Sequence, residues 1–119
     1  MSKGAELRFD KRFNVYVLIS KRLKALADPT RLGIIHSLCD EEKNVSSLVE
    51  DSGFSQARIS KHLRILREEK LVTTRRVNRN IYYNISNDFP RRICKLVFES
   101  LECTNRDDME LLKRHRDYF

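Results

Sequence analysis

The spacing of apolar residues changes once along this chain of 119 residues, just after Leu71. Before that point, and again from about residue 88, apolar residues recur every three or four positions, which is the period of an amphipathic helix. Between these parts, the runs LVTTRR and IYYNI are rich in β-branched and aromatic residues, and Val77-Asn78-Arg79-Asn80 separates them. Asparagine tolerates the positive φ of a tight turn, so the stretch predicts a hairpin. We expect a mainly α-helical chain with one small β-hairpin.

Four residues mark the helix ends that precede the hairpin. Asp28 stands before a proline, which disfavours helical dihedrals, and it suits the N-cap of a new helix that has Pro29 at its first position. Asn44 and Ser55 are N-cap residue types, and Gly53 permits a left-handed turn between them. The predicted helices therefore cover residues 7–27, 29–39, a short segment from 44 to the glycine, 55–70 and 88–103, with a charged tail over 105–119 that is helical only in part. The first and last helices carry apolar stripes, formed by Phe13, Tyr16, Val17, Leu23 and Leu26 and by Ile93, Leu96, Val97, Ser100 and Leu101. In the helices between them, the expected inward positions are Leu32, Ile35, Leu38 and Cys39; Val45, Leu48 and Val49; and Ile59, Leu63 and Leu66.

Positive charge is concentrated in one part of the chain. The whole sequence has a formal net charge of +7, and residues 55–82 hold eight Lys and Arg against two Glu, a net of +6. A charge focused in this way favours a polyanionic partner, whereas a charge that serves solubility is spread out. The alternative is that these charged residues form only a solvent-exposed helix face, which is the usual explanation of a run of charges.

Two short helices joined by a glycine-containing turn form a helix-turn-helix, here over 44–70, and the hairpin over 71–85 adds a basic wing. The second helix of such a unit enters the major groove of DNA. Short polar side chains near its start reach base edges, and Gln56 suits a bidentate contact with adenine. Lys and Arg neutralise phosphates. The predicted DNA-binding residues are Ser55, Gln56, Ala57, Arg58, Ser60, Lys61, His62, Arg64, Arg75, Arg76 and Arg79.

Length and composition exclude other classes of protein. A chain of this size suits one domain, so we expect residues 1–119 to form a single winged-helix DNA-binding domain. The first residues lack the apolar core of a secretory signal and no run reaches membrane-spanning length, so we expect a cytoplasmic protein without a membrane partner. No phosphate loop and no Cys-His spacing indicates catalysis, so no enzyme is expected. A winged helix that binds a partner protein remains an alternative.

The segments LKALADPTRLGIIHSL and SQARISKHLRILREEKLVTTRRVNRNIYY also resemble the ArsR family of bacterial and archaeal winged-helix repressors. The likeness covers about residues 23–85. It implies a homodimer that binds an inverted-repeat operator and leaves DNA when an effector binds. It also places Gln56, Ala57, Ser60 and Lys61 at bases and Arg79 at the wing tip. Two family glycines are replaced, by Lys70 and by the wing asparagine, at positions that favour left-handed geometry.

The family's two common metal sites lack their ligands in this sequence. The arsenic site uses Cys-Val-Cys in the third helix, where this chain has EKNVSSL, so Asn44 and Ser46 replace both thiols. Soft metalloids need thiolate ligands. The zinc-type site needs Asp-x-His on the last helix, and residues 89–103 contain neither residue type. No cofactor is therefore required, and a metalloid or metal ion is expected only at the cysteines.

Cys39, Cys94 and Cys103 are the remaining candidates for a switch. A thiol- and persulfide-sensing branch of the family carries one cysteine in the second helix and one near the end of the last. The resemblance thus implies a role for Cys39, shifted from the family position at His36, together with Cys103. A thiophilic metalloid at Cys94 and Cys103 is an alternative, although nine residues turn a helix by about 180°, so that site needs Cys39, a helix break or a partner subunit. Each cysteine is also a candidate for simple packing.

The first and last helices, 7–27 and 88–104, remain for dimerisation. Their apolar stripes are expected to pack across a twofold axis, which sets two recognition helices into successive major grooves roughly 34 Å apart.

Overall fold

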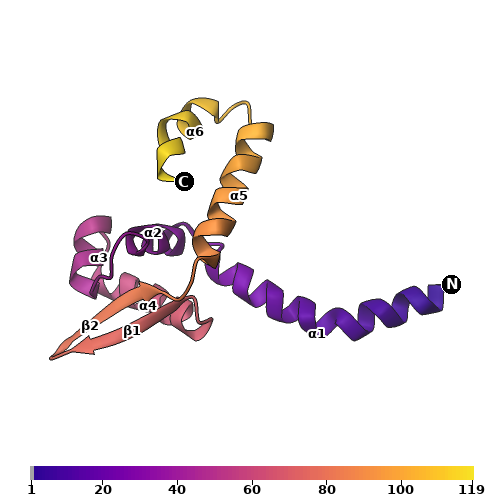
Figure 1. The fold of residues 1–119 in the computed structure, drawn as a ribbon, viewed down its shortest axis with the longest axis horizontal. Coiled ribbons are helices and arrows are strands. Elements are labelled where there is room, and N and C mark those ends of the chain that lie inside the picture. The colour runs from indigo at the N-terminus through magenta and orange to yellow at the C-terminus, as the bar shows by residue number, and fades with distance from the viewer. Residues whose placement is uncertain (1) are drawn as a thin grey trace.

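The structure is a computed structural model that describes the backbone of residues 2–119 and the side chains of residue 9 and residues 11–119. The elements are the helices α1 (Ser2–Leu26), α2 (Pro29–Leu38), α3 (Val45–Ser52), α4 (Gln56–Glu68), α5 (Phe89–Thr104) and α6 (Met109–His115), the strands β1 (Val72–Val77) and β2 (Asn80–Ile85), and the 3₁₀-helix η1 (Arg116–Tyr118). The two strands form one antiparallel hairpin (Figure 1). The predicted mainly helical fold with a single small hairpin is confirmed.

The helix-start signals in the sequence act as predicted. The side chain of Asp28 accepts a hydrogen bond from the backbone N–H of Arg31 at 3.1 Å, and that of Asn44 accepts one from Ser47 at 2.9 Å. Gly53 adopts the left-handed φ of 73° that ends α3. These contacts satisfy N–H groups that the first turn of a helix leaves without partners. They therefore set where α2 and α3 begin.

The core lies between α2, α3, α4 and the start of the hairpin. Its buried side chains are Ala25, Leu26, Ile34, Ile35, Leu38, Leu48, Ile59, Leu63, Leu66, Leu71 and Val72. One prediction for α2 is wrong: Leu32, expected inside, is 38% exposed, and Ile34 is buried instead. The α2 surface that packs on α3 and α4 is therefore rotated from the predicted one, because Leu32 faces a pocket on the other side of the helix.

A Lys-containing left-handed turn joins α4 to the hairpin. The N–H of Leu71 donates to Leu66 O and the N–H of Lys70 to Arg67 O, both at 2.9 Å. This pair of bonds is the Schellman motif, which needs a left-handed residue, and Lys70 has φ 58°. The family's glycine is replaced here, yet the chain keeps the geometry and directs β1 back over the core.

The hairpin is in register from Val72 opposite Ile85 to Val77 opposite Asn80. Asn78 takes the positive φ of 57° at its turn, as predicted. A short bridge ties the hairpin to the loop before α3, because the backbones of Lys43 and Tyr83 exchange hydrogen bonds of 3.1 and 2.8 Å. The wing is thus anchored at its base and free at its tip.

Helix α1 projects from the rest of the molecule (Figure 1). The whole structure, α1 included, measures 60 × 39 × 23 Å. Many of the apolar side chains of α1 are exposed, and α5 carries further exposed ones. These residues are Phe9, Phe13, Val15, Tyr16, Val17, Leu18, Ile19 and Leu23 on α1, and Leu96, Val97 and Leu101 on α5. In the described part of the chain, no helix combines the length and apolar character that a bilayer crossing needs. We call these exposed residues the apolar surface of α1 and α5.

The tail folds back along α5 (Figure 1). Leu112 of α6 is buried, and Arg116 pairs with Glu102 of α5 at 2.6 Å. The ring of Phe119 stacks on Phe98, with centroids 4.7 Å apart and planes 15° apart. The end of the tail therefore lies against α5 and α2, where it forms one wall of a pocket.

Candidate nucleic-acid interface

Burial of one side of α4 turns the other side outward. Ile59, Leu63 and Leu66 are 0–1% exposed and fasten the helix to the core. Ser55 caps the helix by accepting a hydrogen bond from the N–H of Arg58 at 3.2 Å. The predicted contact residues Ser55, Gln56, Ala57, Arg58, Ser60, Lys61 and Arg64 are all exposed. The start of α4, where a recognition helix meets base edges, is therefore open to a partner.

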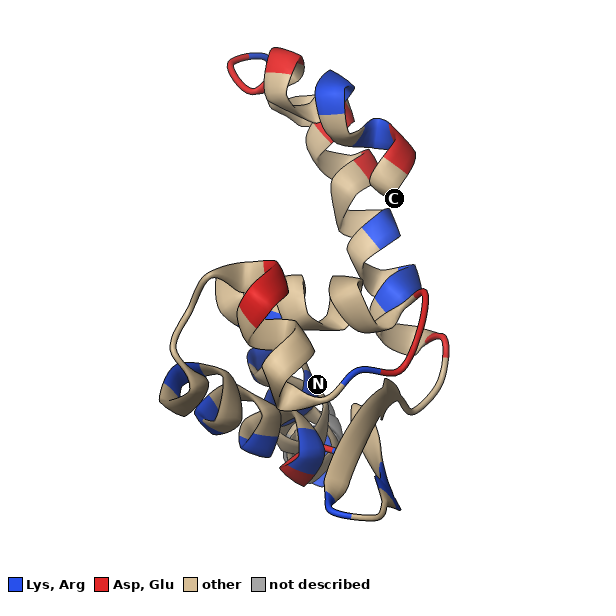
Figure 2. Ribbon diagram, turned by 90° about the vertical axis from the view of Figure 1, so that its left-hand side faces the viewer, with Lys and Arg blue, Asp and Glu red and all other residues tan. Residues whose placement is uncertain are grey.

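Basic residues recur along α4 and gather at the tip of the hairpin, at the bottom of Figure 2. On these two elements the exposed cations are Arg58, Lys61, Arg64, Arg67, Arg75, Arg76 and Arg79. We call this set the basic face. Higher up in the same view, α5 and the tail carry both signs of charge. Lys and Arg concentrated on a helix and the adjoining wing are the electrostatic footprint expected for a nucleic acid.

Two arginines of the basic face also have partners within the protein. The Arg58 guanidinium donates to Thr30 Oγ1 at 2.8 Å and lies 3.6 Å from the centroid of the Phe54 ring. Arg75 forms a bidentate pair with Glu42, and this hydrogen bond holds the pKa of the Glu42 carboxyl below its ordinary value. Arg58 is thereby held in a fixed direction, and the charge of Arg75 is largely balanced.

His62 points away from the basic face. Its side chain is only 13% exposed, and its Nδ1 lies 3.1 Å from Arg31 Nη1. Because the guanidinium can only donate, Nδ1 is the acceptor and the ring is neutral in this arrangement. Burial lowers the pKa of His62, the charges of Arg31, Lys61 and Arg58 add to this, and Asp28 opposes it. The structure therefore gives this predicted contact residue an internal role.

Arg31 joins three helices and was not among the predicted site residues. Besides its contact with His62 of α4, it donates from Nε to Ala25 O at 2.5 Å and from Nη2 to Lys24 O at 3.1 Å. These carbonyls belong to the last turn of α1, which an arginine stabilises by direct hydrogen bonding. The DPTR segment signals a helix start in the sequence, but nothing in its spacing shows this long-range link.

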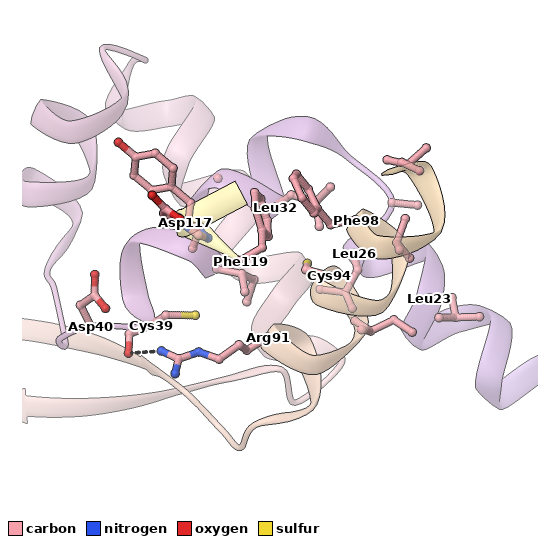
Figure 3. A pocket seen from close by; sticks show the side chains of 18 residues that line it. Leu23, Leu26, Leu32, Cys39, Asp40, Arg91, Cys94, Phe98, Asp117 and Phe119 are labelled. Carbon is pink, nitrogen blue, oxygen red and sulfur yellow. Dashed lines mark hydrogen bonds between the residues drawn. The ribbon is translucent and has the colours of Figure 1, made fainter. Parts of the chain in front are cut away.

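Two of the three cysteines lie in one pocket. Cys39, the C-cap of α2, and Cys94 on α5 both line it, whereas Cys103 is exposed near the end of α5 and is outside the lining (Figure 3). Burial raises the pKa of Cys94, and the nearby Cys39 adds to the effect. Arg91 donates to the Cys39 carbonyl oxygen at 3.0 Å. Among the described residues, no three His, Cys, Asp or Glu side chains form a metal-binding group.

Comparison of the sequence and the fold with known proteins identifies a family. A sequence model described as "Bacterial regulatory protein, arsR family" matches residues 28–74, the region from the start of α2 into β1. Nodulation protein NolR of Rhizobium meliloti is 47% identical over 66 residues, which are 56% of this chain and 54% of NolR. The chain thus spans about half the length of that relative.

Two further matches cover more of both chains. The arsenical resistance operon repressor of Escherichia coli (strain K12) is 35% identical over 89 residues, 74% of this chain and 76% of the repressor. A solution structure of a homodimeric winged helix-turn-helix DNA-binding domain from Mycobacterium bovis is 26% identical, has a TM-score of 0.72, and covers 82% of this chain and 90% of that one. The matched proteins are regulators, which confirms the prediction that this chain is not an enzyme. With the wing, the recognition helix and these matches in agreement, the chain belongs to the ArsR family of bacterial regulatory proteins.

Proposed function

We propose that the protein is a sequence-specific, DNA-binding transcriptional repressor. One observation carries the proposal: the polar side of α4 is exposed from its first turn and lies beside a basic hairpin, while its apolar side is buried. In such an interface, phosphate contacts position the protein and base contacts specify the sequence. Residues 1–119 act as one winged-helix unit in this proposal, with double-stranded operator DNA as the partner.

The exposed residues divide into two roles. Gln56, Ser60 and Lys61 lie on the outward side of the first turns of α4 and read bases. Arg64, Arg76 and Arg79 hold phosphates, with the last at the free tip of the wing. Arg58 orients the interface through Thr30 and Phe54, and Arg75 contributes less because Glu42 balances its charge.

The test is fluorescence anisotropy with labelled DNA from upstream of the gene and with random DNA, at several salt concentrations. Gln56→Ala weakens binding to the specific site more than to random DNA. Arg79→Ala weakens binding to both, and it flattens the slope of log affinity against log salt by about 0.9 for each phosphate that the protein no longer neutralises. Arg92→Ala, an exposed arginine on α5 outside the basic face, is the matched control and leaves both unchanged. Equal reductions in affinity for both DNAs in Gln56→Ala would contradict base reading.

We also propose that the protein is a homodimer through the apolar surface of α1 and α5. Exposed apolar side chains gathered on two neighbouring helices mark an interaction surface, and a twofold axis lets the same patch cover itself. Leu96 on α5 is 61% exposed and Ile81 on the hairpin is 41% exposed. In sedimentation equilibrium, Leu96→Glu shifts the protein toward monomer and Ile81→Glu does not. A monomeric unmodified protein at micromolar concentration would refute the dimer.

Release from DNA proceeds through cysteine thiols in this proposal, by oxidation or by a reactive sulfur species. The shared pocket supports Cys39 and Cys94 as the pair, instead of the Cys39 and Cys103 that the family resemblance implies, because Cys103 lies about 13.5 Å farther along α5. A two-thiolate metalloid site at the same pair is the second candidate, since soft ions favour thiolates. A gel shift with persulfide, peroxide, arsenite or zinc, followed by mass spectrometry of the cysteines, distinguishes these effectors.

A further inference from the structure

A pocket of about 950 Å³ lies between α2, α5, the end of α1 and the tail (Figure 3). Most of its lining is apolar, including Leu26, Ile35, Phe98 and Phe119. Leu23, Val97 and Leu101 also line it, so the pocket adjoins the apolar surface of α1 and α5 through which the protein is proposed to dimerise. Its size lies within the range of pockets that hold small organic molecules, and such pockets are apolar with a few placed polar groups. We call it the α2–α5 pocket.

Three of its polar residues lie together at one end, whereas Asp117 lies apart from them near Phe119. Figure 3 shows Arg91, Cys39 and Asp40 together there, with Leu23 and Leu26 at the opposite side. Arg91 uses one N–H for the Cys39 carbonyl, and among the described residues it forms no ion pair within 4 Å, so further N–H groups are free to donate. The lining carries Asp40 and Asp117 against the single Arg91. This balance disfavours an anionic ligand and suits a neutral molecule that accepts one hydrogen bond.

We propose that the α2–α5 pocket binds a neutral, apolar α,β-unsaturated ketone or quinone, and that Cys39 adds covalently to it. This inference rests on the proposed repressor function, in which the adduct is the releasing signal. It differs from an oxidative switch because it needs no oxidant and no second cysteine.

The addition balances without a co-reactant. The Cys39 thiol gives up its proton to water as its sulfur forms a bond to the β-carbon, and the π electrons of the C=C bond move to the carbonyl oxygen to give an enolate. Arg91 donates a hydrogen bond to that oxygen and stabilises the developing charge. The proton released by the thiol returns through water to the α-carbon. The guanidinium does not lose its proton in proteins, so Arg91 remains a cationic donor throughout the addition.

Cys39 is the nucleophile, and Cys94 is a lining residue. Thiolate is the reactive form, and a reactive cysteine is partly exposed beside a cation. Cys39 is half-buried and next to Arg91. Burial raises the pKa of Cys94, so this thiol gives up its proton less readily than a thiol in water does.

The pocket is connected to the DNA-binding helix α4 through α2. One side of α2 lines the pocket through Leu32, Ile35 and His36. The first turn of the same helix holds α4 through two side-chain contacts, Thr30 with Arg58 and Arg31 with His62. A ligand that displaces α2 therefore changes the position of α4, and the two sites share one rigid element.

The experiment treats the full-length protein with 3-nonen-2-one, with acrylamide as a small polar electrophile, and with 2-nonanone as the saturated analogue. Intact mass and peptide mapping give the rate and the site of modification, and N-acetylcysteine gives the intrinsic ratio of the two electrophiles. The expected result is that the ratio of the enone rate to the acrylamide rate is at least about tenfold higher for Cys39 than for N-acetylcysteine. This excess is equivalent to about 1.4 kcal/mol of binding in the pocket. Cys39→Ser abolishes the adduct, whereas Cys103→Ser retains it.

Arg91→Gln slows the addition, and the neighbouring Arg92→Gln, which is outside the lining, does not. If Cys39 prefers the enone over acrylamide no more than N-acetylcysteine does, the proposal is overturned; this result is expected if a second copy of the chain fills the pocket. A peptide map that places the adduct on Cys103 also overturns it. DNA binding is measured on the same samples. Failure of the unmodified protein to bind DNA refutes the repressor function while the adduct rates still test the pocket, and an adduct that leaves DNA affinity unchanged overturns the signalling role.

Discussion

Replacement of Arg31 by alanine tests whether one side chain joins α1, α2 and α4. The guanidinium donates to the carbonyls of Lys24 and Ala25 at the end of α1 and to Nδ1 of His62 on α4. Arg31→Ala removes all three hydrogen bonds and leaves the Ala25 carbonyl and the half-buried imidazole without this donor. The helix junction is therefore expected to loosen, although every core side chain stays in place.

The expected magnitude follows from the three hydrogen bonds. A bond to a charged group contributes about 1.5–3 kcal/mol when buried, and partial exposure here reduces that to about 1 kcal/mol each, so the free energy of unfolding falls by about 3 kcal/mol. For a chain of this length that corresponds to a Tm lower by about 12 °C. Arg22→Ala is the matched control, because Arg22 also lies on the α1–α4 junction. Its side chain is 46% exposed, and its contact with Glu69 is a long one of 3.8 Å between Nε and Oε1. A surface pair of that kind contributes about 0–1 kcal/mol.

The assay is urea unfolding followed by circular dichroism, with both variants and the unmodified protein at one concentration so that any dimerisation is constant. Arg31→Ala lowers the unfolding midpoint well beyond Arg22→Ala, without a change in slope. If the two variants agree within about 0.5 kcal/mol, the hydrogen bonds of Arg31 do not hold the junction and the reasoning is refuted.

Two further predictions concern the turn after α4 and the buried imidazole. Lys70 holds a left-handed φ that strains a residue with a Cβ, so Lys70→Gly raises the free energy of unfolding by about 1 kcal/mol. Arg67→Gly, inside α4, lowers it by about as much. Both changes are measured by urea unfolding, and a lower stability of Lys70→Gly would contradict the backbone strain. Because the pKa of His62 is lowered in the folded protein, the unfolded chain binds the proton first, so stability falls as pH drops below about 6.5. His62→Gln removes this contribution, and an unchanged pH profile between about pH 7.5 and 5.5 in that variant would refute it.

Local sequence signals predicted most of the fold because each acts over a few residues. The N-caps at Asp28, Asn44 and Ser55 and the left-handed Gly53 bond to their own neighbours, so residue type is enough. The hairpin followed for the same reason, from its asparagine turn and its β-branched strands. The one wrong inward position, Leu32, lies on a short apolar helix whose sequence permits more than one buried side.

For the candidate site, the sequence predicted the exposed residues of α4 but not the internal contacts of its charged ones. Arg58 meets Thr30, 28 residues away, and Arg75 meets Glu42, 33 residues away. No periodicity reports such pairs, since they depend on how three helices and a loop are placed together.

What the sequence alone determined is the winged helix and its basic face, because caps, period and charge are local properties of the chain. Only the tertiary structure decided which cysteines share a pocket. Cys39 and Cys94 are far apart in the chain, and they line one space because α5 and the tail pack against the end of α2. It also decided that His62 faces Arg31 inside the protein, since burial depends on which surfaces of α1, α2 and α4 meet.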